Sequence, residues 1–168
     1  MIHLSQGKLT IFSGLISIVV PFLIYLFRKQ SKKLIVFLFA VCLFVIFYET
    51  LFTREMGTER KLDLLPLKSY FQFSSKYMRY QVYMNVFLFI PFGFLIPFTS
   101  KRTFFQVLLI GCCLSITIEA LQYIFALGLC ETDDVIHNTF GTIIGYWYWV
   151  GLNAFSRKFN IIKRGKDK

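Results

Sequence analysis

The feature of this sequence that most restricts its fold is a series of five long apolar runs. They cover residues 9–27, 34–52, 82–98, 104–129 and 135–155. A helix of about 20 residues crosses the roughly 30 Å hydrocarbon core of a bilayer. The chain is also 56% hydrophobic, with 21 Phe among 168 residues, which is more apolar surface than a soluble domain buries. The sequence therefore predicts an all-α integral membrane protein, a single domain of about five transmembrane helices.

The third and fourth apolar runs differ from a straight transmembrane helix of about 20 residues. Pro91 and Pro97 interrupt the run at 82–98. Proline removes a backbone donor and bends a helix, so we expect a kink or a partial crossing there. The run at 104–129 is longer than a crossing needs, so we expect it to tilt or to end early.

The positions of the basic residues predict the orientation of the chain. Lys and Arg number four between the first two runs, six at 53–81, two between the third and fourth runs, none between the last two, and six after residue 155. Because basic residues are retained on the cytoplasmic side, the twelve in the first, third and last of these segments favour an N-out, C-in topology. This topology makes the loop 53–81 extracytoplasmic. Basic clusters alternating with apolar runs indicate membrane lipid as a partner and argue against nucleic acid.

Glu119 is the most informative polar residue because it lies inside the fourth apolar run. Ionisable groups at membrane depth are costly and usually mark functional sites. Ser115 and Gln122 fall on the same helical face as Glu119, and Asp134 and Asn138 share one face of the next run. A very short connection joins the two runs, so we expect these faces to pack against each other.

Counting outward from this connection predicts which residues meet. We expect Gln122 to lie near Asn138, and Glu119 to lie opposite Gly141 and Gly145. These two glycines form a GxxxG pattern, which predicts close helix packing.

Three more polar residues lie at the extracytoplasmic ends of the predicted helices or in the loop between them. They are Arg54, Asp63 and Asn85. Together with the residues of the last two runs they predict a polar cavity that opens outward. Asp133 and Asp134 also have a structural explanation, since acidic residues at a helix start cap it and favour its dipole. His137 has no companion histidines and the four cysteines have no zinc or disulfide spacing, so we expect no metal and no cofactor.

Taken in order, these residues resemble the VanZ-like family of bacterial membrane proteins. The matching positions are Arg54, Asp63–Pro66, Asn85, Pro91–Gly93, Glu119–Gln122, Asp134, Asn138, Gly141 and Gly145. The sequence departs from the family at Gly128, where many members have arginine, and at Glu131, where aspartate is common. The resemblance implies a multi-pass protein of the bacterial cytoplasmic membrane that is associated with resistance to the glycopeptide antibiotic teicoplanin.

Three functions are compatible with this sequence. A resistance protein without enzymatic activity would bind a lipid-linked wall precursor or other envelope component, the lipoglycopeptide or a partner. Its binding residues would be Arg54, Asp63, Asn85, Glu119, Gln122, Asp134 and Asn138. An intramembrane enzyme would modify a lipid or a cell-wall precursor with Glu119 as general acid or base. A small transporter is the third alternative, and the absence of an internal repeat disfavours it.

Overall fold

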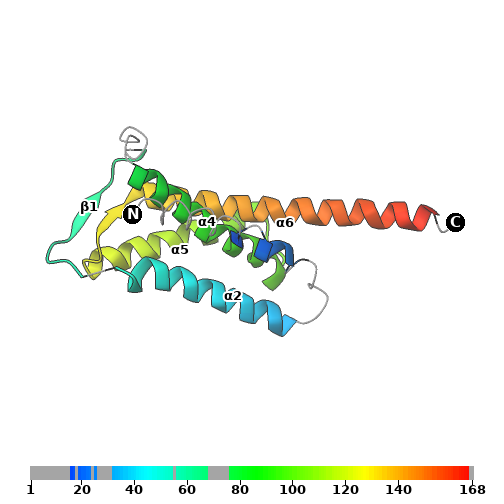
Figure 1. Ribbon diagram of the computed structural model, residues 1–168, viewed down its shortest axis with the longest axis horizontal. Helices are drawn as coiled ribbons and strands as arrows, with labels where there is room; N and C mark the ends of the chain where they lie inside the picture. Colours follow the sequence, from blue (N-terminus) through cyan, green and yellow to red (C-terminus); the bar gives the residue numbers. More distant parts are fainter. Residues whose placement is uncertain are drawn as a thin grey trace.

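The protein is an elongated helical bundle with a small sheet at one end (Figure 1). The computed structural model describes residues 16–17, 19–23, 25, 32–54, 56–67 and 76–166. Helix α2 spans Lys32–Phe47 and continues as a π-helix, η1, over Tyr48–Phe52. The other helices are α4 (Lys76–Thr99), α5 (Phe104–Ile124) and α6 (Thr132–Lys166). Helix α6 lies along α4 and α5 and extends well beyond them (Figure 1).

Three helices in the described part of the chain are long and apolar enough to cross a membrane. They are Lys32–Phe52, Tyr80–Thr99 and Phe104–Ile124, and they correspond to the predicted second, third and fourth spans. Bulky side chains on these helices are exposed, among them Phe44 at 66% and Phe105 at 76%. Apolar surface on this scale fits contact with lipid rather than with water.

The first and fifth predicted spans stay predictions. Most of 9–27 lies outside the described residues, although those described between 16 and 25 are helical. Residues 135–155 are helical, as part of α6, but α6 is not among the three apolar candidates. Composition explains this difference, because α6 carries Asp133, Asp134, His137 and Asn138 near its start and is less apolar than α2, α4 and α5. The N-out, C-in orientation likewise stays a prediction.

Helix α4 is continuous through both of its prolines and is long enough over Tyr80–Thr99 to cross a membrane, and the kink or partial crossing expected at 82–98 stays a prediction. Helix α5 starts at the predicted residue because Thr103 and Gln106 form a capping box. It ends at Ile124, five residues before the apolar run does. Ala126 has a φ of 52° and Gly128 a φ of 132°, and this left-handed backbone turns the chain out of the helix.

Helices α4 and α6 approach each other at backbone distance. A β-carbon added to Gly141 would lie 2.2 Å from the carbonyl oxygen of Val86, and one added to Gly145 would lie 2.1 Å from that of Ile90. On the facing helix, a β-carbon at Gly93 would lie 2.0 Å from the carbonyl oxygen of Thr142. The GxxxG pattern therefore packs α6 against α4, as small residues allow.

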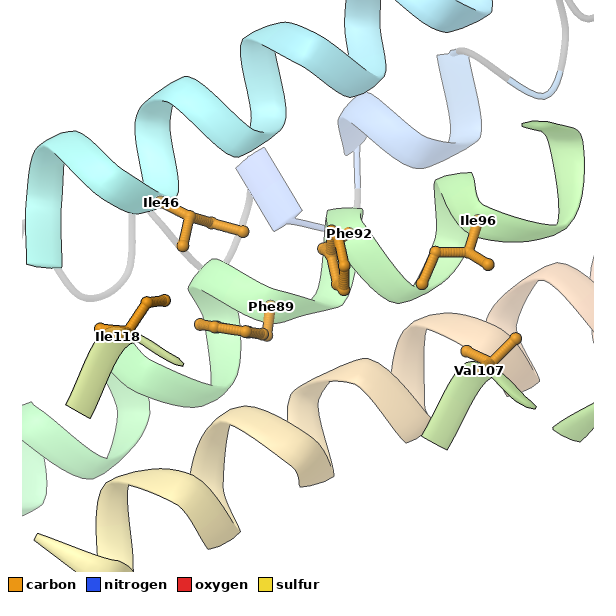
Figure 2. Packing of buried hydrophobic residues seen from close by; sticks show 6 residues of the cluster. All are labelled: Ile46, Phe89, Phe92, Ile96, Val107 and Ile118. Carbon is orange, nitrogen blue, oxygen red and sulfur yellow. The ribbon is translucent and has the colours of Figure 1, made fainter. Parts of the chain in front are cut away.

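The apolar core lies where α2, α4 and α5 meet. Figure 2 shows its buried members, which are Ile46, Phe89, Phe92, Ile96, Val107 and Ile118. Phe92 stacks on Phe39 of α2 with ring centroids 5.5 Å apart, and it meets Phe89 edge to face. These contacts hold α2 against α4.

A two-stranded parallel sheet closes one end of the described part of the bundle, and the all-α prediction did not include it. Strand β1 (Lys61–Asp63) pairs with β2 (Leu129–Glu131), so that Asp63 lies opposite Glu131. Two further bonds attach the same loop, since Gly57 N donates to Ala126 O over 2.7 Å and Leu67 N donates to Asp133 Oδ1. The loop after α2 is thereby fastened to the connection between α5 and α6.

Candidate functional site

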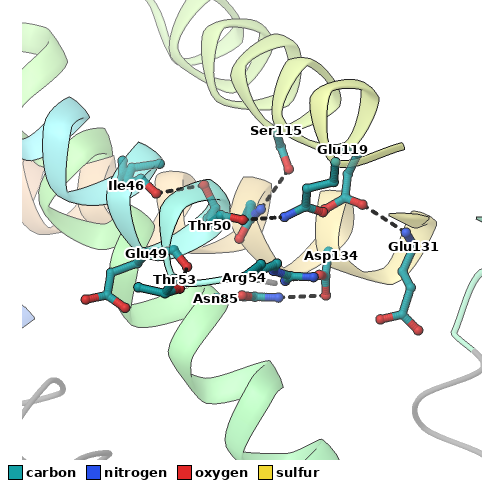
Figure 3. Close-up of polar contacts among 12 residues, drawn as sticks. Ile46, Glu49, Thr50, Thr53, Arg54, Asn85, Ser115, Glu119, Glu131 and Asp134 are labelled. Carbon is teal, nitrogen blue, oxygen red and sulfur yellow. Dashed lines mark hydrogen bonds and ion pairs between the residues drawn. The ribbon is translucent and has the colours of Figure 1, made fainter. Parts of the chain in front are cut away.

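Polar side chains from α4, α5, α6 and the residue two positions after η1 gather at the end of the bundle that carries the sheet (Figure 3). We call them the polar cluster: Arg54, Asn85, Ser115, Glu119, Gln122, Asp134 and Asn138. Glu119, Gln122, Ser115 and Asn138 are all at least nine-tenths buried. Each of them therefore needs a hydrogen-bond partner inside the protein.

Asp134 joins three elements of the bundle. Its Oδ1 accepts a hydrogen bond of 2.6 Å from Asn85 Nδ2 of α4, and its Oδ2 lies 3.9 Å from Arg54 Nη2 (Figure 3). The guanidinium of Arg54 also borders Gly128, where a β-carbon would lie 3.0 Å from Nη1. Arg54 thus supplies positive charge next to the acidic connection between α5 and α6. It does so beside position 128, where this chain has glycine.

Glu119 is held by a backbone amide. Its Oε2 accepts a hydrogen bond of 2.9 Å from Glu131 N in β2 (Figure 3), and its side chain is nearly fully buried. The sheet places that amide, because the pairing of β1 with β2 fixes the backbone at residue 131. A carboxylate that accepts an N–H bond in a low-dielectric site is oriented more strongly than one in water.

Gln122 and Asn138 do not meet each other. Gln122 Nε2 donates to Thr50 O over 2.9 Å, and Asn138 Nδ2 donates to Ser115 Oγ over 2.8 Å. The register expected from counting is therefore wrong by about two turns of α5, since Ser115 lies where Gln122 was expected. The count began at residues 130–131, whereas α5 ends at Ile124 and the strand β2 intervenes.

The same shift places the two glycines differently from the prediction. Gly141 and Gly145 face α4 and not Glu119. On α5 it is Gly111 that approaches α6, where a β-carbon would lie 2.6 Å from Thr142 Oγ1.

The π-helix η1 accounts for the bond that Gln122 makes. In this segment Thr53 N donates to Tyr48 O, five residues back, over 3.1 Å. A π-turn at a helix end shifts the backbone pattern, and such turns often occur at functional sites. The carbonyl of Thr50 is then satisfied by the Gln122 side chain, which connects α5 to the end of α2.

Asp63 lies in the sheet, apart from the contacts of Asp134. Its Oδ1 accepts from Leu65 N over 3.3 Å, which closes the turn after β1. Asp133, at the start of α6, accepts a hydrogen bond from Leu67 N and so anchors the loop to α6. The structural role expected for Asp133 at the helix start is thus combined with a role in holding the loop.

Acidic residues raise one another's pKa in the connection outside the spans. Burial, together with Asp134, Asp133 and Asp63, raises the pKa of Glu131 to about 7, and Arg54 opposes this shift. Burial and the neighbouring Glu119 raise the pKa of the Cys130 thiol to about 11. Cys130 is therefore a neutral thiol at physiological pH and a poor nucleophile.

A cavity of about 440 Å³ opens beside the polar cluster. Arg54 and Asn85 line it together with Glu49, Thr50, Thr53, Tyr80, Gln81, Met84, Leu88 and Leu127. Glu119, Asp134 and Asn138 are not among the lining residues and lie behind this wall. The arrangement fits a binding cavity whose exposed groups are oriented by a buried second layer.

The described residues contain no group of three or more His, Cys, Asp or Glu side chains placed to hold a metal ion. Sequence reasoning missed two contributors to the cluster, the carbonyl of Thr50 and the amide of Glu131. Both are backbone groups, and only the π-turn and the sheet bring them to the side chains that they bind.

Apolar helices that bury a polar cluster at one end define a helical membrane protein with a polar site beside the end of α2. A family model described as VanZ/LLP1 matches residues 34–154, so the chain belongs to the VanZ/LLP1 family. It is also similar to Protein VanZ of Enterococcus faecium, with 35% identity over 88 residues, which are 52% of this chain and 51% of that protein. The chain thus matches about half the length of this relative. No solved structure matches the chain.

Proposed function

We propose that this protein contributes to glycopeptide resistance, and to teicoplanin resistance in particular, at the outer face of the bacterial cytoplasmic membrane. It does so by binding a lipid-linked envelope component, the lipoglycopeptide or a partner at the cavity beside the polar cluster. Membership of the VanZ/LLP1 family and the similarity to Protein VanZ support the role in resistance.

The observation that carries the binding proposal is the position of Arg54. Arg54 lines the cavity, its guanidinium forms an ion pair of 3.9 Å with the Asp134 carboxylate, and it lies in the space that a side chain at position 128 would occupy. A guanidinium held in this way is preorganised for a phosphate or carboxylate, because little side-chain entropy is lost on binding. Asn85 lines the same cavity and is fixed by the same carboxylate.

The contacts of Glu119 support a positioning role rather than general acid–base chemistry. A general base must reach the proton that it abstracts, within about 3 Å or through one water molecule. Glu119 is buried behind the cavity wall and is engaged by the Glu131 amide. The binding function therefore agrees better with this geometry than the enzyme does.

Susceptibility measurements test the proposed function. The chain is expressed in a teicoplanin-sensitive Gram-positive host, and the inhibitory concentration of teicoplanin is compared with that of an empty-vector strain. The unmutated chain should raise the inhibitory concentration, and Arg54→Gln should abolish the increase. Arg60→Gln is the matched control, because Arg60 is exposed in the same loop and does not line the cavity.

Three further variants probe the buried layer of the polar cluster. Glu119→Gln, Asp134→Asn and Asn138→Ala should each lower resistance at normal protein levels, because each removes or weakens a contact that orients the layer in front. An unmutated chain that leaves susceptibility unchanged would contradict the resistance role. If all three variants confer the same resistance as the unmutated chain, the polar cluster has no part in resistance.

The orientation is part of the proposal and has its own test. With the N-terminus outside, the loop 53–81 is extracytoplasmic and the α4–α5 connection is cytoplasmic. In a chain whose four native cysteines are replaced by serine, a membrane-impermeant maleimide applied to intact cells should label Arg60→Cys and leave Arg102→Cys unlabelled until the cells are opened. Labelling of Arg102→Cys in intact cells would show that the chain has the opposite orientation.

A further inference from the structure

The cavity beside the polar cluster continues into a second, apolar cavity. This second cavity also measures about 440 Å³ and lies between the residues described from 16 to 20, α2 and α4. Among its lining residues are Val20, Leu38, Val41, Val45, Pro91 and Leu95. Glu49, Tyr80, Met84 and Leu88 line both cavities, so the two meet at these side chains.

The apolar cavity is open on the side that faces the surroundings of the bundle. Val20, Val41 and Val45 line it and are exposed at 36%, 41% and 42%. In a helix that spans a membrane, this side faces the hydrocarbon region. An acyl chain can therefore enter laterally from the bilayer. A polar ligand of comparable size would lose its hydrogen bonds to water against this aliphatic lining, which disfavours its binding.

The charges at the junction restrict the headgroup that such a chain carries. Arg54 is the basic residue and Glu49 the acidic residue among those that line the polar cavity. Arg54 already lies 3.9 Å from the Asp134 carboxylate. An anionic headgroup would approach two carboxylates with one guanidinium between them, so its net electrostatic attraction is weak. A headgroup that has a phosphate and an ammonium complements both Arg54 and Glu49.

We propose that the paired cavities form a binding site for an aminophospholipid. An acyl chain occupies the apolar cavity, the phosphate lies in the polar cavity against Arg54, and the short ethanolamine arm folds back so that its ammonium meets Glu49 at the junction of the two cavities. The proposal rests on the proposed function for the membrane setting and for the use of the Arg54 cavity as the ligand site. It adds the chemical class of the ligand and the place of its acyl chain.

Native mass spectrometry of the full purified chain tests the proposal. The protein is incubated in detergent with equal concentrations of dioleoyl phosphatidylethanolamine and dioleoyl phosphatidylglycerol, and each bound fraction is measured. We expect phosphatidylethanolamine to be retained about five- to tenfold more than phosphatidylglycerol, which corresponds to one charge-assisted contact. Glycerophosphoethanolamine, which has the headgroup without acyl chains, should not be retained. Equal retention of the two lipids, or retention of the headgroup alone, would overturn the proposal.

Two pairs of variants test the two halves of the site. Val41→Trp fills the apolar cavity and should lower retention of both lipids several-fold, about as expected for loss of a buried chain segment. Val36→Trp is its control, because Val36 is a valine of the same helix, exposed at 58%, that lines neither cavity. If the two tryptophan variants retain lipid equally, the apolar cavity is not the site of the acyl chain.

Glu49→Gln removes the acidic partner of the ammonium and leaves the shape of the site almost unchanged. It should bring the retention of phosphatidylethanolamine down to that of phosphatidylglycerol, whereas Glu59→Gln in the exposed loop should leave the preference intact. An unchanged preference in Glu49→Gln would refute the headgroup assignment. Teicoplanin susceptibility of the same strains is a separate readout. A chain that confers no resistance contradicts the proposed function, whereas the lipid-retention measurements alone decide whether the paired cavities bind an aminophospholipid.

Discussion

Replacing Gly141 by alanine should force helices α4 and α6 apart. The new β-carbon would lie 2.2 Å from the carbonyl oxygen of Val86, whereas β-carbons in real proteins stay beyond 3.0 Å. The α6 backbone must therefore move by at least 0.8 Å, the difference between these two distances. The obstacle is backbone, which cannot rotate away as a side chain can, and overpacking of this kind costs about 1–3 kcal/mol.

Gly151 provides the matched control for this prediction. It lies in the same helix, and a β-carbon there would meet nothing within 4 Å. Both substitutions gain the same helix propensity, about 1 kcal/mol, so their difference isolates the clash. Unfolding in mixed micelles with increasing SDS should show Gly141→Ala less stable than Gly151→Ala by about 1–3 kcal/mol. Equal stability of the two variants would show that α4 and α6 are not in backbone contact.

The contacts of the polar cluster and its connection lead to three more predictions. Gln122→Leu leaves the Thr50 carbonyl without its donor and should lower the free energy of unfolding by about 1–2 kcal/mol, measured in the same SDS titration. The pKa of Glu131 is raised from 4.5 to about 7, so its protonated form is favoured in the folded protein and its contribution to stability is lost as the pH rises through 7. Glu131→Gln should make the fall in stability between pH 4.5 and 7 less steep, whereas Glu59→Gln should leave it unchanged. Asp133→Ala removes the acceptor that holds the end of the loop and should speed hydrogen exchange of the loop amides, with exchange in α5 unchanged.

Hydropathy and helix periodicity predicted much of the fold. The apolar runs located α2, α4 and α5, and the faces of α5 and α6 selected residues that the structure places in one cluster. Apolar content is a local property of the chain, so a single sequence records it. Position along a helix face is equally local, which is why Glu119 and Gln122 could be selected together.

The remaining contacts depend on backbone geometry that composition does not encode. The end of α5 at Ile124 and the short strand β2 shifted the register between α5 and α6, so Ser115 and not Gln122 meets Asn138. The same applies to η1, whose π-turn presents the Thr50 carbonyl to the Gln122 side chain. The sheet pairs residues 61–63 with 129–131 across more than 60 positions, and such distant pairing has no signal in one sequence.

The hydrogen bond that anchors Glu119 comes from the backbone amide of Glu131, so position 131 matters to the site whatever its side chain is. Every side chain at position 131 leaves the donor in place, with proline as the exception because it has no N–H. Relatives could therefore vary freely at this position while the carboxylate stays anchored. A deep mutational scan should show the corresponding pattern, in which position 131 tolerates many residues and rejects proline, while position 119 tolerates few.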